Sequence, residues 1–201
     1  DKESGHEFEI DNEFIMSPKD LCTIGFMDQV LDAGVSVLKL EGRGRAPEYV
    51  RTTTECYREA ANAYIKGNYN QEKVKGWMSR LETVYNRGFW DGYYLGQKLG
   101  EWAGVSGSKS TKKKIFVAKT NRYYPKLGVA EFDLVTGKIA KGDTILLTGK
   151  ITGVFETIVD EIHLDRTLVN EVNKGDHFSL KLSEPVRAGD RLYKVVDSDL
   201  T

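Results

Sequence analysis

The sequence has few cysteines, no long apolar run and almost no net charge, and each shortage excludes a class of protein. Two cysteines in 201 residues, Cys22 and Cys56, are too few and too far apart for a disulfide framework. No apolar run is long enough to cross a membrane, and the first six residues do not resemble a signal peptide. The net charge of −1 excludes a generally basic nucleic-acid coat, although not a local basic patch. We therefore expect a cytoplasmic protein, in a reducing compartment, that has no membrane partner.

What the sequence does contain is organised around residues 35–50. Val35–Leu40 is a short apolar run rich in β-branched residues, which predicts a strand buried on both faces. Glu41 ends the run, glycines and arginines alternate as far as Arg45, and Pro47 stands where a helix should begin. Charged residues just past the end of a strand line the active face in β/α folds, so this turn is the first place to look for a site.

Three charged residues of this turn are the candidate site residues. Glu41 and Arg43 are candidate catalytic residues, and Arg43 and Arg45 are candidates for binding an anionic group of the substrate. Two guanidinium groups beside a helix N-terminus suit an anion, because free N–H groups and the helix dipole add to their charge. The alternative is structural: Glu41 and one arginine form an ion pair that closes the turn. The spacing alone does not separate the two.

Helical spacing of apolar residues predicts three helices in the first half of the chain. The first begins at Ser17-Pro-Lys-Asp20, which has the pattern of a capped helix start, and ends at Gly34. The second spans about 47–67 and the third about 71–85. With one buried strand and no evident neighbour for it, this block cannot close a barrel or form a covered sheet. It therefore resembles a fragment of a larger β/α domain. The alternative is a small α+β domain in which the strand pairs with residues 8–16.

The two segments that follow connect the halves of the chain. Residues 86–96 are rich in aromatic residues and glycine, which favours packing at a domain junction over a platform for stacking bases. Gly104–Lys114 is rich in glycine, serine and lysine, which is typical of a flexible linker. We therefore place a domain boundary between residues 106 and 107.

Beyond the linker the apolar period becomes that of strands. Three turns, Lys141-Gly-Asp143, Lys174-Gly-Asp176 and Ala188-Gly-Asp190, each precede a strand and are interpreted as structural, with glycine at positive φ and aspartate bonding nearby backbone. Closely spaced short strands with turns between them indicate a small closed β-barrel. The predicted strands lie near residues 115–120, 127–134, 144–148, 154–159, 177–182 and 191–196.

Four motifs carry a resemblance to a known family: Met16-Ser-Pro-Lys-Asp-Leu-Cys22, Asp32-Ala-Gly-Val-Ser-Val-Leu-Lys-Leu-Glu-Gly-Arg43, Pro47-Glu-Tyr-Val50 and Asn86-Arg-Gly-Phe89. They resemble the end of the catalytic domain of peptidase family U32, the collagenase-like proteases. The resemblance implies an α/β plus all-β fold. Residues 1–106 would be the C-terminal end of a modified (β/α)8 barrel, and residues 107–201 a small closed β-barrel similar to domain 2 of elongation factor Tu. The earlier barrel strands and the upstream cysteine motifs of the family are missing here.

The resemblance also implies that the whole protein is an enzyme and that this chain lacks a complete active site. A U32-type peptidase would hydrolyse peptide substrates, although no serine, cysteine or metal protease constellation is visible in this chain. The alternative branch comprises iron–sulfur-dependent, oxygen-independent hydroxylases of tRNA or ribosomal RNA, whose β-barrel would help to bind RNA. A third reading makes the β-barrel a binding module only.

In the hydroxylase branch, Cys22 matches the position of one cluster ligand, just after Lys-Asp-Leu. A cluster normally needs four thiolates, so the others would have to come from outside this chain. The alternative for Cys22 is a small apolar residue near a helix start, and Cys56 is interpreted as structural. We expect no cofactor in this chain alone, and its three histidines show no ligand spacing. The incomplete N-terminal block predicts an oligomer or another cover for its apolar surface.

Overall fold

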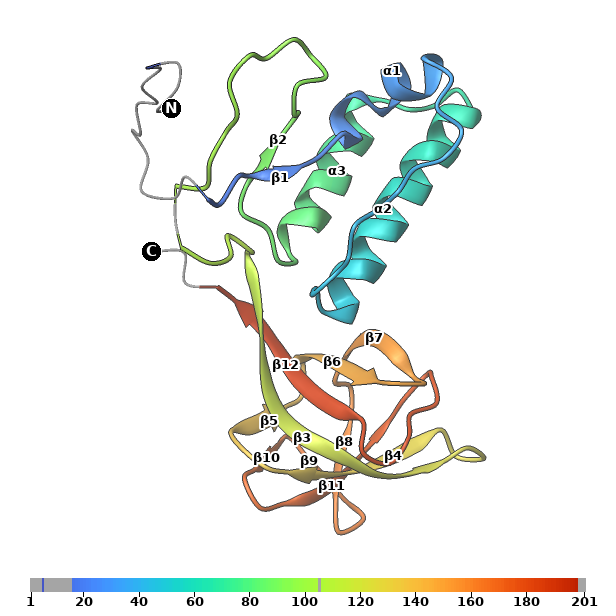
Figure 1. Cartoon of the computed structure of the whole chain (residues 1–201). Helices are drawn as coiled ribbons and strands as arrows, with labels where there is room; N and C mark the ends of the chain where they lie inside the picture. Colours follow the sequence, from blue (N-terminus) through green and yellow to red (C-terminus); the bar gives the residue numbers. More distant parts are fainter. Residues whose placement is uncertain (1–4, 6–15, 105, 199–201) are drawn as a thin grey trace. The chain divides into compact units, whose positions relative to one another are not determined.

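The computed structural model describes residues 5, 16–104 and 106–198, which form two compact units. The described residues up to Glu41 and Thr52–Thr111 make up the first unit. Gly42–Arg51 and the residues from Lys112 onward make up the second. Figure 1 shows both, coloured along the chain. The strand considered near residues 8–16 falls almost wholly outside the described residues, so its pairing stays a prediction.

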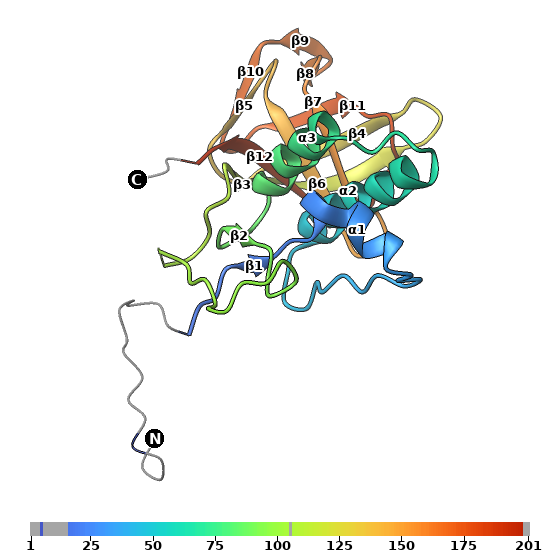
Figure 2. The same cartoon turned by 90° about the horizontal axis from the view of Figure 1, so that it is seen from above.

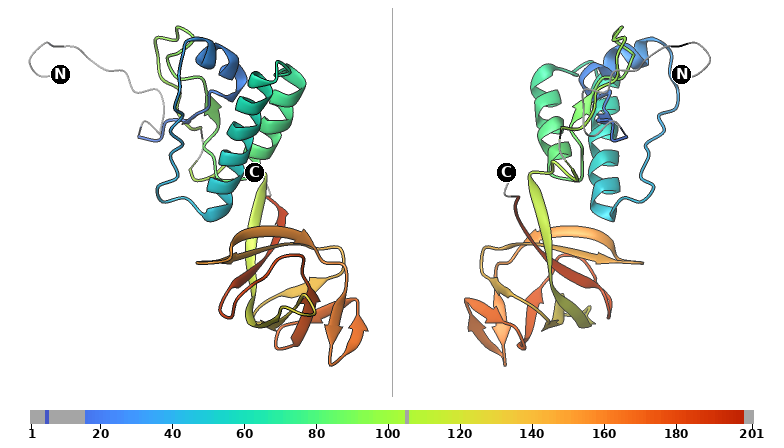
Figure 3. Two further views of the ribbon diagram at one scale, coloured as in Figure 1. Left: turned by 90° about the vertical axis from the view of Figure 1, so that its right-hand side faces the viewer. Right: turned by 60° about the vertical axis from the view of Figure 1, so that its left-hand side comes forward.

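The first unit is helical. Its main elements are α2 (Pro47–Ile65), which belongs to this unit from Thr52 onward, and α3 (Gln71–Glu82), preceded by the short η1 (Ile24–Phe26) and α1 (Met27–Asp32). Figures 1 and 3 show α2 and α3 side by side, running in opposite directions. Among the described residues, none of the helices is long and apolar enough to span a membrane. The core contains the buried side chains of Cys22, Ile24, Met27, Cys56, Ala60, Ala63, Val74, Trp77 and Leu81.

The helix predicted to start at Ser17 begins later, so the capping prediction is wrong. Asp20–Leu21 instead forms β1, which pairs in parallel with β2 (Phe89–Trp90); Figure 2 shows the two strands together. The Asp20 carboxylate accepts the backbone N–H of Arg87 at 2.8 Å and pairs with its guanidinium at 3.2 Å. A tertiary partner has therefore replaced the helix start that local sequence favoured.

Val35–Leu40 is not a strand, and the prediction of a strand buried on both faces is wrong for this chain. The segment has no assigned secondary structure and joins no sheet among the described residues. Val35 and Val37 are 41% and 82% exposed, whereas Leu38 packs against the core of the first unit. An apolar run is buried on both faces only where strands flank it and helices cover them. The described part of this unit supplies no such strands, so no (β/α)8 barrel is formed here.

The second unit is an antiparallel sheet with a separate two-stranded ribbon. The ribbon pairs β5 (Lys138–Ala140) with β10 (Glu171–Asn173). The six predicted strand segments correspond to β3, β4, β6, β7, β11 and β12. In spatial order the eight strands of the sheet are β7 (Gly153–Ile158), β6 (Thr144–Gly149), β12 (Arg191–Asp197), β3 (Lys112–Tyr124), β4 (Val129–Leu134), β11 (His177–Lys181), β8 (Ile162–Leu164) and β9 (Thr167–Val169).

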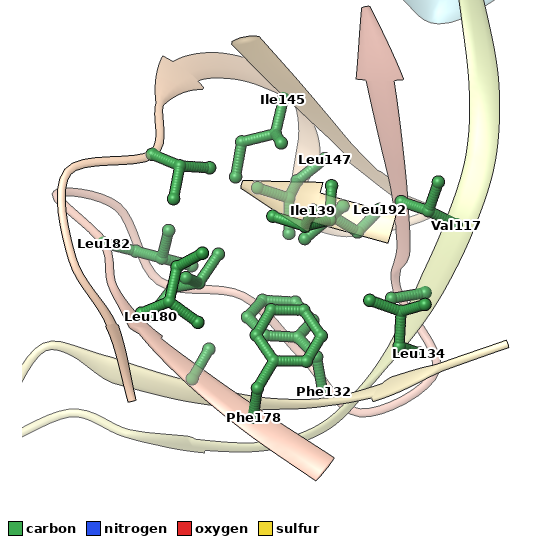
Figure 4. Close-up of a cluster of buried hydrophobic side chains, with 14 of the residues drawn as sticks. Val117, Phe132, Leu134, Ile139, Ile145, Leu147, Phe178, Leu180, Leu182 and Leu192 are labelled. Carbon is green, nitrogen blue, oxygen red and sulfur yellow. The ribbon is translucent and has the colours of Figure 1, made fainter. Parts of the chain in front are cut away.

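The predicted closed barrel is not found, because the sheet stays open. Its two end strands, β7 and β9, are not paired with each other among the described residues. After β9 the chain turns into β10, which pairs with β5 instead of returning to the sheet. The sheet nevertheless curls around one core, to which the ribbon contributes Ile139 and Val172. In Figure 4, Phe132 and Phe178 stack at the centre of this core with ring centroids 5.4 Å apart.

The three glycine–aspartate turns are structural, as predicted. Gly142, Gly175 and Gly189 have φ values of 89°, 99° and 88°, a conformation that side chains other than glycine rarely adopt. In each turn the aspartate carboxylate accepts the backbone N–H of the residue three positions earlier, at 2.7–2.8 Å. These hydrogen bonds fix the turns that lead into the following strands of the second unit.

Candidate functional site

The alternating glycines and arginines form a tight turn in front of α2. The Arg45 N–H donates to the Gly42 carbonyl at 3.0 Å, and Gly44 between them has a φ of 71°. A side chain at Gly42 would approach Val50 Cγ2 to 2.9 Å. Glycine is therefore favoured at both positions, at Gly44 for backbone conformation and at Gly42 for close packing.

The turn gathers the predicted charges at the start of the helix. Arg43 is exposed, as is Glu41, whereas Arg45 is half-buried, with its guanidinium over the Tyr49 ring at 5.6 Å from the centroid. The strand end expected beside them is not formed in this chain. Two guanidinium groups near the first turn of a helix can bind a carboxylate or phosphate, so the roles of Glu41, Arg43 and Arg45 stay predictions.

Cys22 lies in a small buried cluster of sulfur and hydroxyl groups. Its Sγ is 3.8 Å from Met78 Sδ and 3.8 Å from the Tyr57 hydroxyl, which donates to it. The same hydroxyl accepts the Thr23 N–H at 3.0 Å. Burial raises the pKa of the Cys22 thiol, more than the backbone hydrogen bond from Ile24 lowers it. The thiol is thus protonated at neutral pH, whereas cysteine binds metal as a thiolate.

An iron–sulfur cluster does not fit the residues of this chain alone. The second cysteine, Cys56, is fully buried and its Sγ lies 3.8 Å from the Trp77 carbonyl oxygen, as its structural interpretation predicted. Across residues 5, 16–104 and 106–198, no group of three or more His, Cys, Asp or Glu side chains could hold a metal ion. If Cys22 serves as a ligand, its partner thiolates must come from outside the chain, and the thiol must lose its proton on binding.

The aromatic segment packs at its start and is exposed at its end. Asn86 is buried: its side-chain amide donates to the Val84 carbonyl at 3.0 Å, and its backbone carbonyl accepts the Lys109 N–H at 2.7 Å. The C-terminal part of the predicted linker is therefore held against the first unit. Tyr93 and Tyr94 are 62% and 67% exposed. Packing, the interpretation that the sequence favours, accounts for the first half of the segment, and base stacking by the exposed tyrosines stays the untested alternative.

Two histidines that look scattered in the sequence come together in the second unit. His163 on β8 and His177 on β11 line one hollow of about 720 Å³ on the outer face of the sheet. His177 pairs with Asp133, and His163 Nε2 lies 3.6 Å from Glu161 Oε2. The order of the strands, with β11 between β4 and β8, creates this grouping, and no spacing in the sequence reveals it.

Comparisons with known proteins agree with the motifs. The sequence model described as "Peptidase family U32" matches residues 1–104. A protein named "Collagenase" from Porphyromonas gingivalis strain W83 is 50% identical over 194 residues, covering 96% of this chain and 47% of that protein. The "tRNA hydroxylation protein P2" of Bacillus subtilis is 34% identical over 97 residues, covering 41% of this chain and 31% of that protein.

One solved structure adds only a weak likeness. The C-terminal domain of a Geobacillus thermoleovorans protein assigned to the U32 peptidases aligns with a TM-score of 0.38 and 16% identity, covering 39% of this chain and 90% of that domain. The chain spans about half the length of the collagenase-named relative. What that whole protein does is therefore a property of more residues than are present here.

Proposed function

The chain belongs to peptidase family U32, and we propose that it is the C-terminal part of a U32-type peptidase that hydrolyses peptide substrates. The observation that carries the proposal is the 50% identity to a protein named collagenase over 96% of this chain. The hydrolytic step itself is assigned to the whole protein. This chain contributes substrate-binding charges and a β-sheet unit, and it lacks a complete active site.

The exposed segment before α2 supports an incomplete first unit. Val35–Leu40 has the composition of a buried strand but leaves Val35 and Val37 exposed. In the whole protein it becomes a strand of a parallel sheet in a (β/α)8 barrel, with its neighbours supplied by residues beyond this chain. Glu41, Arg43 and Arg45 then stand at the C-terminal end of that strand. There the arginines bind a carboxylate of the peptide.

The test is cleavage of gelatin and of labelled peptides by the whole protein, followed by mass spectrometry. Wild type should release fragments, and Arg43→Ala should slow their release at an unchanged melting temperature. Arg58→Ala is the matched control, because Arg58 is an exposed arginine on α2 and forms no ion pair with any residue that the structure describes. Absence of cleavage by the wild type, or equal loss in both variants, would refute the proposal.

A second candidate function is favoured by a different relative. The similarity to a protein named for tRNA hydroxylation extends over 97 residues, and Cys22 then serves as one ligand of an iron–sulfur cluster in the whole protein. Anaerobic purification with iron and sulfide analysis tests this candidate. Cys22→Ser should remove iron while Cys56→Ser leaves the iron content unchanged. Equal iron in all three proteins would exclude a ligand role for Cys22.

A further inference from the structure

Strand β7 is the longer of the two end strands of the sheet in the second unit. It has six residues, Gly153–Ile158, whereas β9 has three. In the part of the chain that the structure describes, β7 pairs with β6 alone. The register between these two strands runs without a bulge from one end of β7 to the other. The second edge of β7 is therefore open to a further strand.

The backbone of β7 points away from β6 at every second residue. In an antiparallel pair, alternate residues exchange hydrogen bonds with the partner strand. The Val159 N–H, just beyond β7, donates to the carbonyl of Asp143, just before β6, at 2.9 Å. The bonds to β6 therefore fall at the odd-numbered positions. The N–H and carbonyl groups of three even-numbered residues point outward: Val154, Glu156 and Ile158.

One of these outward groups is already bonded. The Val154 carbonyl accepts a hydrogen bond from Arg51 Nη1 at 2.7 Å, and Arg51 belongs to the second unit. This bond agrees with the outward direction of the even-numbered residues. Across the described residues, the outward backbone groups of Glu156 and Ile158 have no backbone partner. Strand addition is therefore open at these two residues.

The features that usually keep an edge strand from pairing are missing from β7. Proteins protect such edges with lysine, proline, a bulge or a very short strand. The sequence Gly-Val-Phe-Glu-Thr-Ile contains neither lysine nor proline. Phe155 is 3% exposed and anchors the strand in the core, whereas Ile158 at the edge is 66% exposed. An anchored edge with exposed apolar surface suits an added strand.

Glu156 is the only charged residue of β7 and is exposed. Because side chains alternate and Phe155 faces the core, Glu156 lies on the outer face of the sheet. Its partner on β6 is Leu146, and the diagonal neighbours Thr144 and Thr148 carry no charge either. Glu156 forms no ion pair with any residue that the structure describes. A lysine or arginine opposite it on an added strand would form a favourable cross-strand pair.

A second copy of this chain fits the edge poorly. A twofold axis through Glu156 would place two like charges directly opposite each other, which is destabilising. An axis through Thr157 would place Glu156 opposite the apolar Ile158. An axis through Phe155 would need the Val154 carbonyl, which is already bonded. Charge complementarity therefore favours a different strand, one that carries a cation.

We propose that the edge of β7 binds an extended, basic segment of the peptide substrate as an added strand. The alternating N–H and carbonyl groups of the edge match the backbone of a polypeptide in β conformation. The proposal rests on the proposed peptidase function and deepens it, because it gives the substrate a binding surface on the β-sheet unit. Backbone hydrogen bonds hold the segment, and Glu156 adds the preference for lysine or arginine.

The test is a titration of the isotope-labelled full chain with peptides, followed by NMR and amide hydrogen exchange. The probe is acetyl-Thr-Val-Thr-Lys-Thr-Val-Thr-amide, and the control peptide has glutamate in place of lysine. Wild type should bind the probe about fivefold more tightly than the control peptide. Binding should slow exchange of the outward Glu156 and Ile158 amides. The Phe155 and Thr157 amides, which point to β6, should stay unchanged.

Two pairs of variants separate the backbone contribution from the charge. Ile158→Pro removes an outward N–H and leaves the bonds to β6 intact, so it should weaken binding at least about tenfold. Ile158→Thr keeps that N–H and should bind the probe nearly as well as wild type. Glu156→Lys should reverse the preference toward the glutamate peptide. Glu184→Lys, at an exposed position of the same unit, should leave the preference unchanged. Melting temperatures verify that each variant is folded.

Cleavage by the whole protein connects the edge to the substrate. Ile158→Pro should raise KM for a lysine-containing peptide at least about fivefold and leave kcat nearly unchanged, because the edge binds the ground state and the transition state equally. Ile158→Thr should keep both constants close to those of wild type. An unchanged KM in Ile158→Pro would show that the substrate does not occupy the edge, and would overturn the proposal.

Other results would overturn the proposal as well. They are absence of binding at about 1 mM probe, or an unchanged preference in Glu156→Lys. Slower exchange of the Glu156 and Ile158 amides at higher concentrations of the chain alone would assign the edge to a second copy. Absence of cleavage by the wild-type whole protein would refute the peptidase function, whereas the titration decides strand addition independently of cleavage.

Discussion

The Asp190 carboxylate occupies the space in which a side chain at Gly149 would lie. A Cβ placed on Gly149 would be 1.8 Å from Asp190 Oδ1. The carboxylate cannot move away easily, because it accepts the Arg187 N–H at 2.8 Å and the Thr152 hydroxyl at 2.5 Å. The end of β6 and the turn before β12 are therefore locked together by one glycine and one buried aspartate.

This contact predicts that Gly149→Ala destabilises the second unit strongly. The methyl group must displace a buried carboxylate with two hydrogen bonds, so we expect a loss of about 3 kcal/mol in the free energy of unfolding. Denaturant unfolding followed by circular dichroism measures it. Gly76→Ala on α3 is the control, since its side chain would meet nothing within 4 Å; it should be neutral or stabilising. A neutral Gly149→Ala would contradict the contact.

The buried thiol of Cys56 predicts a change in stability at alkaline pH. Burial raises its pKa from 9.0 to about 11, so above pH 9 the unfolded chain loses a proton that the folded chain keeps. The stability contributed by Cys56 is complete below pH 9 and falls as pH rises through 11, by about 1.4 kcal/mol per pH unit in between. Relative to Cys56→Ala, wild type should lose about 1 kcal/mol between pH 7.5 and 10. Parallel stability curves for the two proteins would show that burial leaves this pKa unchanged.

The hydroxyl of Tyr57, which contacts Cys22 and Thr23, should contribute to the stability of the first unit. Tyr57→Phe leaves the Thr23 N–H, now bonded at 3.0 Å, without its acceptor, which should cost about 1–2 kcal/mol. Tyr64→Phe is the control: its hydroxyl bonds Asp32 at an exposed site, so stability should hardly change. Thermal unfolding compares the two variants. If Tyr57→Phe and Tyr64→Phe melt together, the buried hydrogen bond is not stabilising.

The helices could be predicted well from the sequence where local patterns and tertiary packing agree. Pro47 begins α2, and α3 begins at Gln71 after Asn70, whose side chain accepts the Lys73 N–H. The pattern failed at Asp20, where pairing with Arg87, 67 residues away, replaced a helix cap. It also missed β8, β9 and the ribbon of β5 and β10. Segments of three residues are too short to show a strand period.

The candidate site could be located but not assembled from the sequence. The glycine turn and its charges lie in front of α2 as predicted, because glycine and proline fix local backbone geometry. The strand before it failed to form, because its pairing depends on neighbours that local sequence does not specify. The grouping of His163 with His177 was missed for a similar reason: only the strand order places β8 beside β11.

Substitutions of Arg43 and Glu41 distinguish a functional turn from a structural ion pair. If Arg43 binds the substrate through its planar fork, Arg43→Lys should lower the activity of the whole protein at least about tenfold while the melting temperature stays unchanged. Glu41→Gln should behave in the same way. Parallel assays of peptide cleavage and thermal unfolding measure both. Loss of stability in proportion to loss of activity would assign the two residues to a structural ion pair.

In the proposed whole protein, Val35–Leu40 becomes a strand that it does not form in this chain alone. This strand places Glu41, Arg43 and Arg45 at its end. Hydrogen exchange of the backbone amides of Val35–Leu40, compared between this chain and the whole U32 protein, tests it directly. We predict rapid exchange in the chain alone, where Val37 is 82% exposed, and exchange slower by more than about a hundredfold in the whole protein. Equally rapid exchange in both would contradict the account.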